Sequence, residues 1–185
     1  MHIDPHLFTD EAVSDETRQF NAGLQQMLLA MPDTSQFEPE QIRKARREGK
    51  SWLGPVIYSD RARTITIDGP GGDLELRIID ADEPKGVYLH IHGGGWVLGA
   101  ADLSDVGNEA MARDAGVTVV SVEYRLAPED PYPAGVDDCV AAARWLISNG
   151  EESFGSNRLT IGGESAGANL AAATLLRIRD EVGYT

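Results

Sequence analysis

The sequence contains almost nothing that could cross-link the chain covalently or anchor it in a membrane. Cys139 is the only cysteine among 185 residues, which excludes an intrachain disulfide and a cysteine-based zinc site. The amino terminus lacks the basic and apolar regions of a signal peptide, and no apolar run approaches the length of a membrane span. We therefore expect a cytoplasmic protein without a membrane span, in which Cys139 is a core thiol.

Basic residues are also scarce. Sixteen Lys and Arg against thirty Asp and Glu give a net charge of −14, which repels nucleic acid and anionic membranes. A basic cluster at residues 43–50 runs against this balance, and we interpret it as the solvated face or end of a helix. Apolar residues make up 42% of the chain, enough for the core of one domain of ordinary size. We expect no nucleic-acid partner.

Two regions differ in their hydrophobic pattern. Residues 1–55 carry no strand signals; apolar residues recur at helical spacing from Phe20 to Met31, and a second helix is expected over Pro39–Arg47. We predict a helical cap over residues 1–55 and an α/β core over residues 56–185.

Within the core, strand-like and helical stretches alternate. Two short alternating stretches around a Gly-rich turn predict an antiparallel hairpin, and the denser apolar runs after them predict a parallel sheet with right-handed crossovers. The expected strands are 64–67, 74–78, 87–91, 117–122 and 159–161, and the helices are 103–114, 133–148 and 168–179. The fold class is therefore α/β, a mostly parallel sheet opened by a hairpin.

The segment Gly163-Glu164-Ser165-Ala166-Gly167 is the strongest chemical signal in the chain. It reads G-x-S-x-G between a short apolar strand and a helix, the context of a nucleophile elbow. The turn leaves no room for side chains beside the serine, which explains the flanking glycines. We predict Ser165 as the catalytic nucleophile.

A second Gly-rich segment, His92-Gly93-Gly94-Gly95-Trp96, follows an earlier strand. A loop of this HGGG type supplies one half of an oxyanion hole, and the residue after the nucleophile supplies the other. We predict Gly94, Gly95 and Ala166 as the N–H donors, since backbone amides stabilise the negative charge of a tetrahedral intermediate. His92 and Gly93 are expected to shape the loop. Trp96 is expected to pack beneath it, with a role facing the substrate as the alternative.

Other readings of these segments are weaker. The spacing of Gly93–Gly99 is one residue too long for a dinucleotide loop. His90 and His92 share one face of a strand and could bind a metal, but no carboxylate or third histidine lies nearby in the sequence. We expect no metal and no cofactor, with His90 as a core histidine.

A third motif joins these two. Residues 124–129 read Tyr-Arg-Leu-Ala-Pro-Glu, and Pro131-Tyr132-Pro133-Ala134 follows. Together with HGGGW and GESAG in this order, the chain resembles the hormone-sensitive-lipase-like carboxylesterases, from about Val87 to Leu176. The resemblance implies an α/β-hydrolase core with an N-terminal helical cap. It further implies that the enzyme cleaves small carboxylic esters. It also implies that the arginine and glutamate of the third motif brace the loop after a strand. Many relatives carry Asp where this chain has Glu164.

The catalytic triad is incomplete in this sequence. In α/β-hydrolases the acid and the histidine follow the serine along the chain, but no histidine follows Ser165. Asp180 lies at the end of the helix after the elbow rather than after a later strand, which makes it a poor candidate for the acid. We expect the chain to be the N-terminal part of a longer enzyme, nearly inactive alone, with the 159–161 strand as an exposed edge prone to self-association.

Two functional hypotheses remain open. The first is a serine carboxylesterase, with an amidase or deacetylase of the same family as a variant. The second is a non-catalytic relative that binds a small ligand, as the plant gibberellin receptor does with the same architecture and without the catalytic histidine. We favour the enzyme, because a receptor would lose the histidine by substitution within a complete fold.

Overall fold

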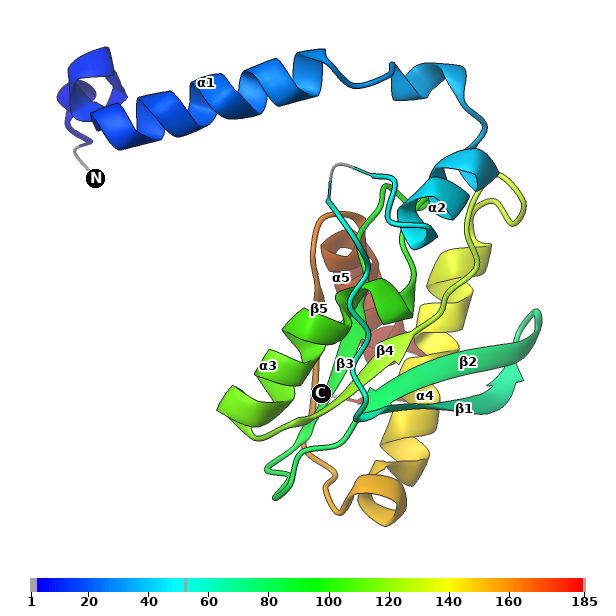
Figure 1. The fold of residues 1–185 in the computed structure, drawn as a ribbon. Helices are drawn as coiled ribbons and strands as arrows, with labels where there is room; N and C mark the ends of the chain where they lie inside the picture. The colour runs from blue at the N-terminus through cyan, green and yellow to red at the C-terminus, as the bar shows by residue number, and fades with distance from the viewer. Residues whose placement is uncertain (1–2, 52, 185) are drawn as a thin grey trace. The chain divides into compact units, whose positions relative to one another are not determined.

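The computed structural model describes residues 3–51 and 53–184 (Figure 1). Its contacts divide the chain into two units, Met1–Glu38 and Pro39–Thr185. The second unit includes a helix, α2 (Pro39–Arg47), that the sequence had grouped with the cap. The domain boundary expected near residue 55 stays a prediction.

The first unit consists of helical segments. They are η1 (Pro5–Phe8), η2 (Asp10–Ala12), α1 (Asp15–Leu29) and η3 (Thr34–Gln36). The side chain of Ser14 caps α1 by accepting a hydrogen bond from the N–H of Thr17 at 3.2 Å. Among its described residues, no side chain of α1 is buried, so the apolar spacing seen in the sequence is not matched by packing within this unit.

The second unit carries the sheet and the helices that cover it. After α2 come the hairpin strands β1 (Ala62–Gly69) and β2 (Gly72–Ile79), then β3 (Val87–Ile91), η4 (Ala101–Ser104), α3 (Asp105–Ala115), β4 (Thr118–Val122), α4 (Ala134–Phe154), β5 (Leu159–Gly163) and α5 (Ala166–Val182). These elements confirm the α/β pattern expected from the sequence. Within the described residues no helix is long and apolar enough to cross a membrane.

The described residues form a five-stranded sheet in the order β1-β2-β4-β3-β5. The hairpin is antiparallel as predicted, and β2 also pairs antiparallel with β4. β3 lies between β4 and β5 and runs parallel to both. The carboxyl ends of β3 and β5 therefore lie side by side, with Ile91 opposite Gly163. β5 is one of the two edge strands of this sheet, and self-association through it stays a prediction.

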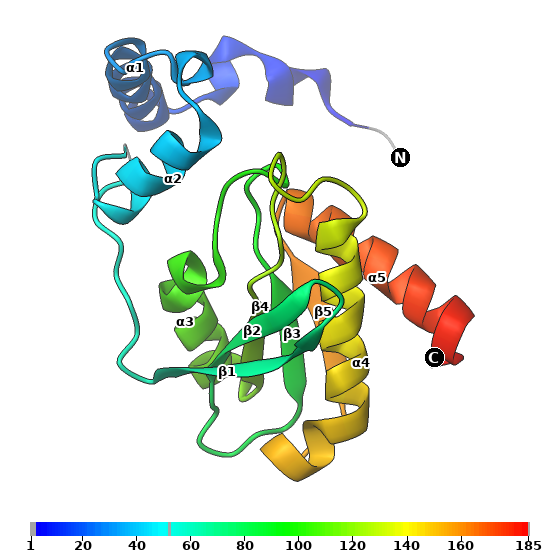
Figure 2. The same ribbon diagram turned by 90° about the vertical axis from the view of Figure 1, so that its right-hand side faces the viewer.

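Helices cover both faces of the sheet, α3 on one and α4 with α5 on the other (Figure 2). The larger core lies on the α4–α5 face. It includes Leu76, Leu89, Ile91, Val120, Val136, Cys139, Leu146 and Leu170. Cys139 is fully buried there, which confirms the core thiol, and burial raises the pKa of its thiol far above the usual value. Val119 faces the opposite way, toward Ala112 of α3, because successive strand side chains alternate between faces.

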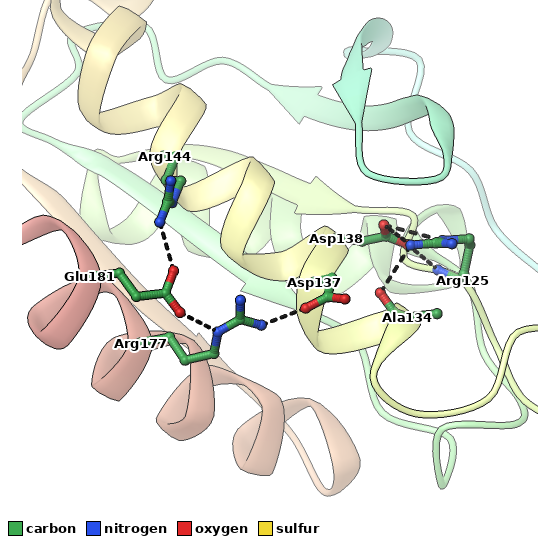
Figure 3. A network of polar contacts seen from close by, with 7 residues as sticks. All are labelled: Arg125, Ala134, Asp137, Asp138, Arg144, Arg177 and Glu181. Carbon is green, nitrogen blue, oxygen red and sulfur yellow. Dashed lines mark hydrogen bonds and ion pairs between the residues drawn. The ribbon is translucent and has the colours of Figure 1, made fainter.

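Arginine contacts orient α5 against α4 (Figure 3). Arg177 of α5 bonds Asp137 of α4 and Glu181 of its own helix. Arg144 of α4 bonds the same Glu181 at 2.6 Å. These groups are partly exposed, so water screens each pair and its contribution to stability is small. Their effect is geometric, because α5 starts directly after Ser165.

The basic cluster at 43–50 lies at the end of α2, which agrees with the sequence-based interpretation, but its arginines are also bonded to other parts of the chain. Arg46 bonds the carbonyl of Gly54 at 2.8 Å, and Arg47 pairs with Asp102 at 2.7 Å. Arg43 reaches parts of the chain more than fifty residues away. The cluster is therefore a docking face of α2, matched to partners that a local pattern does not reveal.

Candidate active site

Ser165 lies on a sharp turn between β5 and α5. Its φ is 54° and its ψ −120°, a backbone conformation that residues with a side chain rarely adopt and that stores strain. The side chain is exposed, and none of the hydrogen bonds among residues 3–51 and 53–184 involves its Oγ. The serine is thus presented at the surface with no partner in this chain's described part.

The glycines beside the serine are required for close packing. A Cβ on Gly167 would overlap the carbonyl oxygen of Ile91 on β3, and one on Gly163 would meet the same atom. The elbow therefore packs with its bare backbone against the strand that leads into the other Gly-rich segment.

We call residues 92–99 the oxyanion loop, after the role that the sequence predicts for Gly94 and Gly95. The loop turns back on itself, as the N–H groups of Val97 and Leu98 donate to the carbonyl of Gly94 at 3.2 and 2.8 Å. Gly94 has a φ of 123°, and a Cβ there would overlap the carbonyl of Leu98. Across residues 3–51 and 53–184, the N–H groups of Gly94 and Gly95 donate to no acceptor.

Glu164 connects the elbow to the oxyanion loop. Its Oε1 accepts the N–H of Gly93 at 2.6 Å, and its Oε2 lies 3.1 Å from Nε2 of His90. Partial burial acts to raise the pKa of this carboxyl, but the hydrogen bonds from His90 and Gly93 outweigh it and lower the pKa. The N–H of Gly93 is therefore already used, unlike those of Gly94 and Gly95.

His90 continues this connection into the sheet. Its Nδ1 lies 2.7 Å from Oγ of Ser121 on β4 and 3.3 Å from Nδ2 of Asn108 on α3. The sequence predicted a core histidine, and it is buried, but its contact with Glu164 was not expected. In the described part of the chain, no group of three His, Cys, Asp or Glu side chains could hold a metal.

His92 is locked inside the base of the oxyanion loop. It is 2% exposed, its ring stacks on Tyr124 with centroids 4.2 Å apart, and its Nδ1 donates to the carbonyl of Gly93 at 2.8 Å. Tyr124 in turn donates its hydroxyl to the carbonyl of His92 at 2.9 Å. Burial lowers the pKa of His92 to about 4, so its imidazole is neutral at pH 7. A neutral ring held in this way supports the loop.

The third motif braces its loop, as the resemblance implied. Arg125 binds the buried carboxylate of Asp138 on α4 through its side chain and its own N–H, both at 2.9 Å (Figure 3). Glu129 is bonded by Arg43 rather than by a residue of its own loop. One other expectation changes here. Trp96 does not pack beneath the oxyanion loop, because it is 49% exposed with a φ of 62°. Asp180 pairs with its neighbour Arg179 on the surface of α5.

Comparisons with known proteins agree with this geometry. Residues 88–184 match a family described by its α/β hydrolase fold. Carboxylic ester hydrolase LipN of Mycobacterium tuberculosis is 38% identical over 71% of this chain and 36% of its own length. Carboxylesterase NlhH of the same species is 48% identical over 52% of this chain and 31% of its own length.

A solved structure extends the likeness to the fold. The hyperthermophilic esterase of the archaeon Pyrobaculum calidifontis aligns with a TM-score of 0.76 and 32% identity, covering 92% of this chain and 55% of that structure. The chain thus spans less than half the length of these two mycobacterial relatives. It belongs to the α/β-hydrolase fold family, among relatives of the hormone-sensitive-lipase-like carboxylesterases.

Proposed function

We propose that this chain carries the nucleophile and the oxyanion hole of a serine carboxylesterase. One observation carries the proposal. The exposed Ser165 lies on a strained turn directly after β5, and the unpaired N–H groups of Gly94 and Gly95 follow the neighbouring strand β3. The esterase names of its relatives support the same chemistry. The substrate is a small carboxylic ester.

The chemistry follows from this arrangement. The Oγ of Ser165 attacks the ester carbonyl carbon, and the carbonyl oxygen takes up the negative charge. Gly94, Gly95 and Ala166 donate their N–H groups to that oxygen, and the Ala166 N–H lies at the positive end of the α5 dipole. Collapse of the intermediate expels the alcohol and leaves an acyl group on Ser165, which water then removes.

The proton of Ser165 needs an acceptor. His90 and His92 are buried and engaged in the sheet and the oxyanion loop, and no histidine follows the serine in this sequence. We therefore propose that the 185 residues alone hydrolyse esters weakly. Without a triad, the oxyanion hole and substrate binding alone leave a rate enhancement on the order of 10³–10⁴ over water.

Intact-protein mass spectrometry with a fluorophosphonate probe tests the nucleophile. We expect one adduct per chain, formed slowly because these residues supply no base, absent in Ser165→Ala and retained in Ser153→Ala, which removes another exposed serine hydroxyl. An adduct on a different residue, or an equal yield in Ser165→Ala, would overturn the assignment.

Turnover tests the missing base. With an acetyl ester of 4-nitrophenol, the expected rate is low and falls further in Ser165→Ala. Turnover at the level of an intact esterase would contradict the claim that the base is absent. A folded chain that is never labelled, but binds small ligands near Gly94, would favour the non-catalytic binder. Amide and acetyl-ester probes offered in parallel separate the amidase and deacetylase variants.

A further inference from the structure

Arg43 on α2 binds two separate segments, the oxyanion loop and the loop after β4, with one guanidinium group. Its Nε donates to the carbonyl of Val97 at 2.7 Å, and one terminal nitrogen donates to the carbonyl of Ala127 at 2.8 Å. Both terminal nitrogens also bind the carboxylate of Glu129, each at 2.9 Å. The helix and the loop after β4 lie side by side in Figure 1.

Two of these partners, Val97 and Ala127, lie in or beside the oxyanion loop. Val97 is part of the oxyanion loop, and its neighbour Trp96 accepts the N–H of Ala127 at 2.9 Å through its carbonyl. A closed ring of contacts therefore lies at the far end of the oxyanion loop. It runs from Arg43 to Val97, along the chain to Trp96, and through Ala127 back to Arg43. Glu164 holds the near end through Gly93. The free N–H groups of Gly94 and Gly95 lie between these two points.

Only an arginine can make this set of contacts. Its planar fork offers five N–H donors in a fixed geometry, whereas a lysine ammonium is a single point from which these three partners are not reached together. The side chain of Arg43 is 21% exposed, while Glu129 is 52% exposed, so water weakens the ion pair itself. The bonds to the two backbone carbonyls are the ones that define the position of the oxyanion loop.

We propose that Arg43 is a positioning residue for the oxyanion hole, which keeps the Gly94–Gly95 turn in place from α2. A helix that only needed anchoring could use a surface carboxylate alone, as Arg47 does with Asp102. The proposal rests on the assignment of the hole made above.

Amide hydrogen exchange tests whether Arg43 keeps the oxyanion loop in place. In Arg43→Lys we expect the amides of Leu98 and Ala127 to exchange about tenfold faster, because their bonds to Gly94 and Trp96 lose their support. Arg46→Lys is the matched control, since Arg46 lies on the same helix and its side chain bonds the carbonyl of Gly54, away from the oxyanion loop. Equal acceleration in both variants, or none in Arg43→Lys, would overturn the proposal, because Arg43 would then only anchor α2.

Reaction with the fluorophosphonate probe separates positioning from stability. We expect Arg43→Lys to lower the limiting rate of Ser165 modification about tenfold with the half-saturating probe concentration within about twofold, since the hole acts on the developing charge. Arg46→Lys should match the wild type in both constants. An unchanged limiting rate despite faster exchange would overturn the link to the hole.

The two readouts also separate this proposal from the assignment of the nucleophile. A wild-type chain that never reacts at Ser165 contradicts the proposed function. In that case the exchange rates of Leu98 and Ala127 still decide whether Arg43 holds the oxyanion loop.

Discussion

The two Gly-rich segments of the site are held in place by different means. The elbow packs its backbone directly on β3, with Gly163 and Gly167 against the carbonyl of Ile91. The oxyanion loop is held by side chains from elsewhere, with Glu164 at one end and Arg43 at the other. Both segments need their glycines, but only the oxyanion loop is also held by the side chain of a residue as distant as Arg43.

Because of this difference, the two segments should tolerate different kinds of substitution. Steric packing resists any added atom but needs no particular residue farther away. Polar contacts tolerate small shifts, yet they fail when one distant partner is removed, and they respond to pH. Substitutions in the two segments should therefore affect stability, pH dependence and reactivity in different proportions.

The largest effect is expected from Gly167→Ala in the elbow. Its Cβ would overlap the backbone carbonyl of Ile91, which belongs to a central strand and cannot move aside. We expect the free energy of unfolding to fall by more than about 3 kcal/mol in urea titrations. Gly107→Ala in α3 is the control, because a Cβ there meets nothing within 4 Å and should stabilise the helix by roughly 0.5–1 kcal/mol. Equal small effects at both positions would contradict steric packing of the elbow.

The sequence predicted the elbow well because its determinants are local. Glycines, a serine and the strand and helix beside them lie within about twenty residues, and parallel β3 and β5 then bring the oxyanion loop alongside. The supports of that loop were not predictable in the same way. Arg43 bonds Val97, Ala127 and Glu129 across 54 to 86 residues, and its run of basic neighbours is typical of a solvated helix face.

Other differences have the same origin. Nothing in the pattern of β2 indicated that it would pair antiparallel with β4, because its alternation fits either partner. The contact of Glu164 with His90 joins residues 74 apart. Trp96 carried a signal that misled, since aromatic residues are usually core, yet its positive φ turns it outward at the loop's tip.

A second prediction concerns the oxyanion loop and pH. In the unfolded chain His92 has its ordinary pKa near 6.5, whereas burial lowers it to about 4 in the folded protein. Between these values the unfolded state binds more protons, so the free energy of unfolding falls as the pH falls. The difference corresponds to about 3 kcal/mol, at 1.36 kcal/mol for each pKa unit.

Urea titrations at pH 7 and pH 4 measure this effect. We expect the wild type to lose about 3 kcal/mol more than His92→Gln over that interval, because glutamine does not titrate. His6→Gln is the control, since its ring lies on the exposed first unit. Parallel losses in the wild type and in His92→Gln would show that His92 does not couple the oxyanion loop to pH.

The smallest change in the free energy of unfolding is expected at Ser165 itself. It tests whether the elbow is more constrained than the oxyanion loop. The serine holds a φ of 54° that favours glycine, at a cost of about 1–3 kcal/mol. Ser165→Gly should relieve that strain and raise the free energy of unfolding by about 1 kcal/mol, after the greater freedom of glycine in the unfolded chain is subtracted. Ser165→Ala keeps the Cβ and should gain nothing. If both variants were equally stable, the strain would not lie in the turn that presents the nucleophile, and the elbow would be no more constrained than the oxyanion loop.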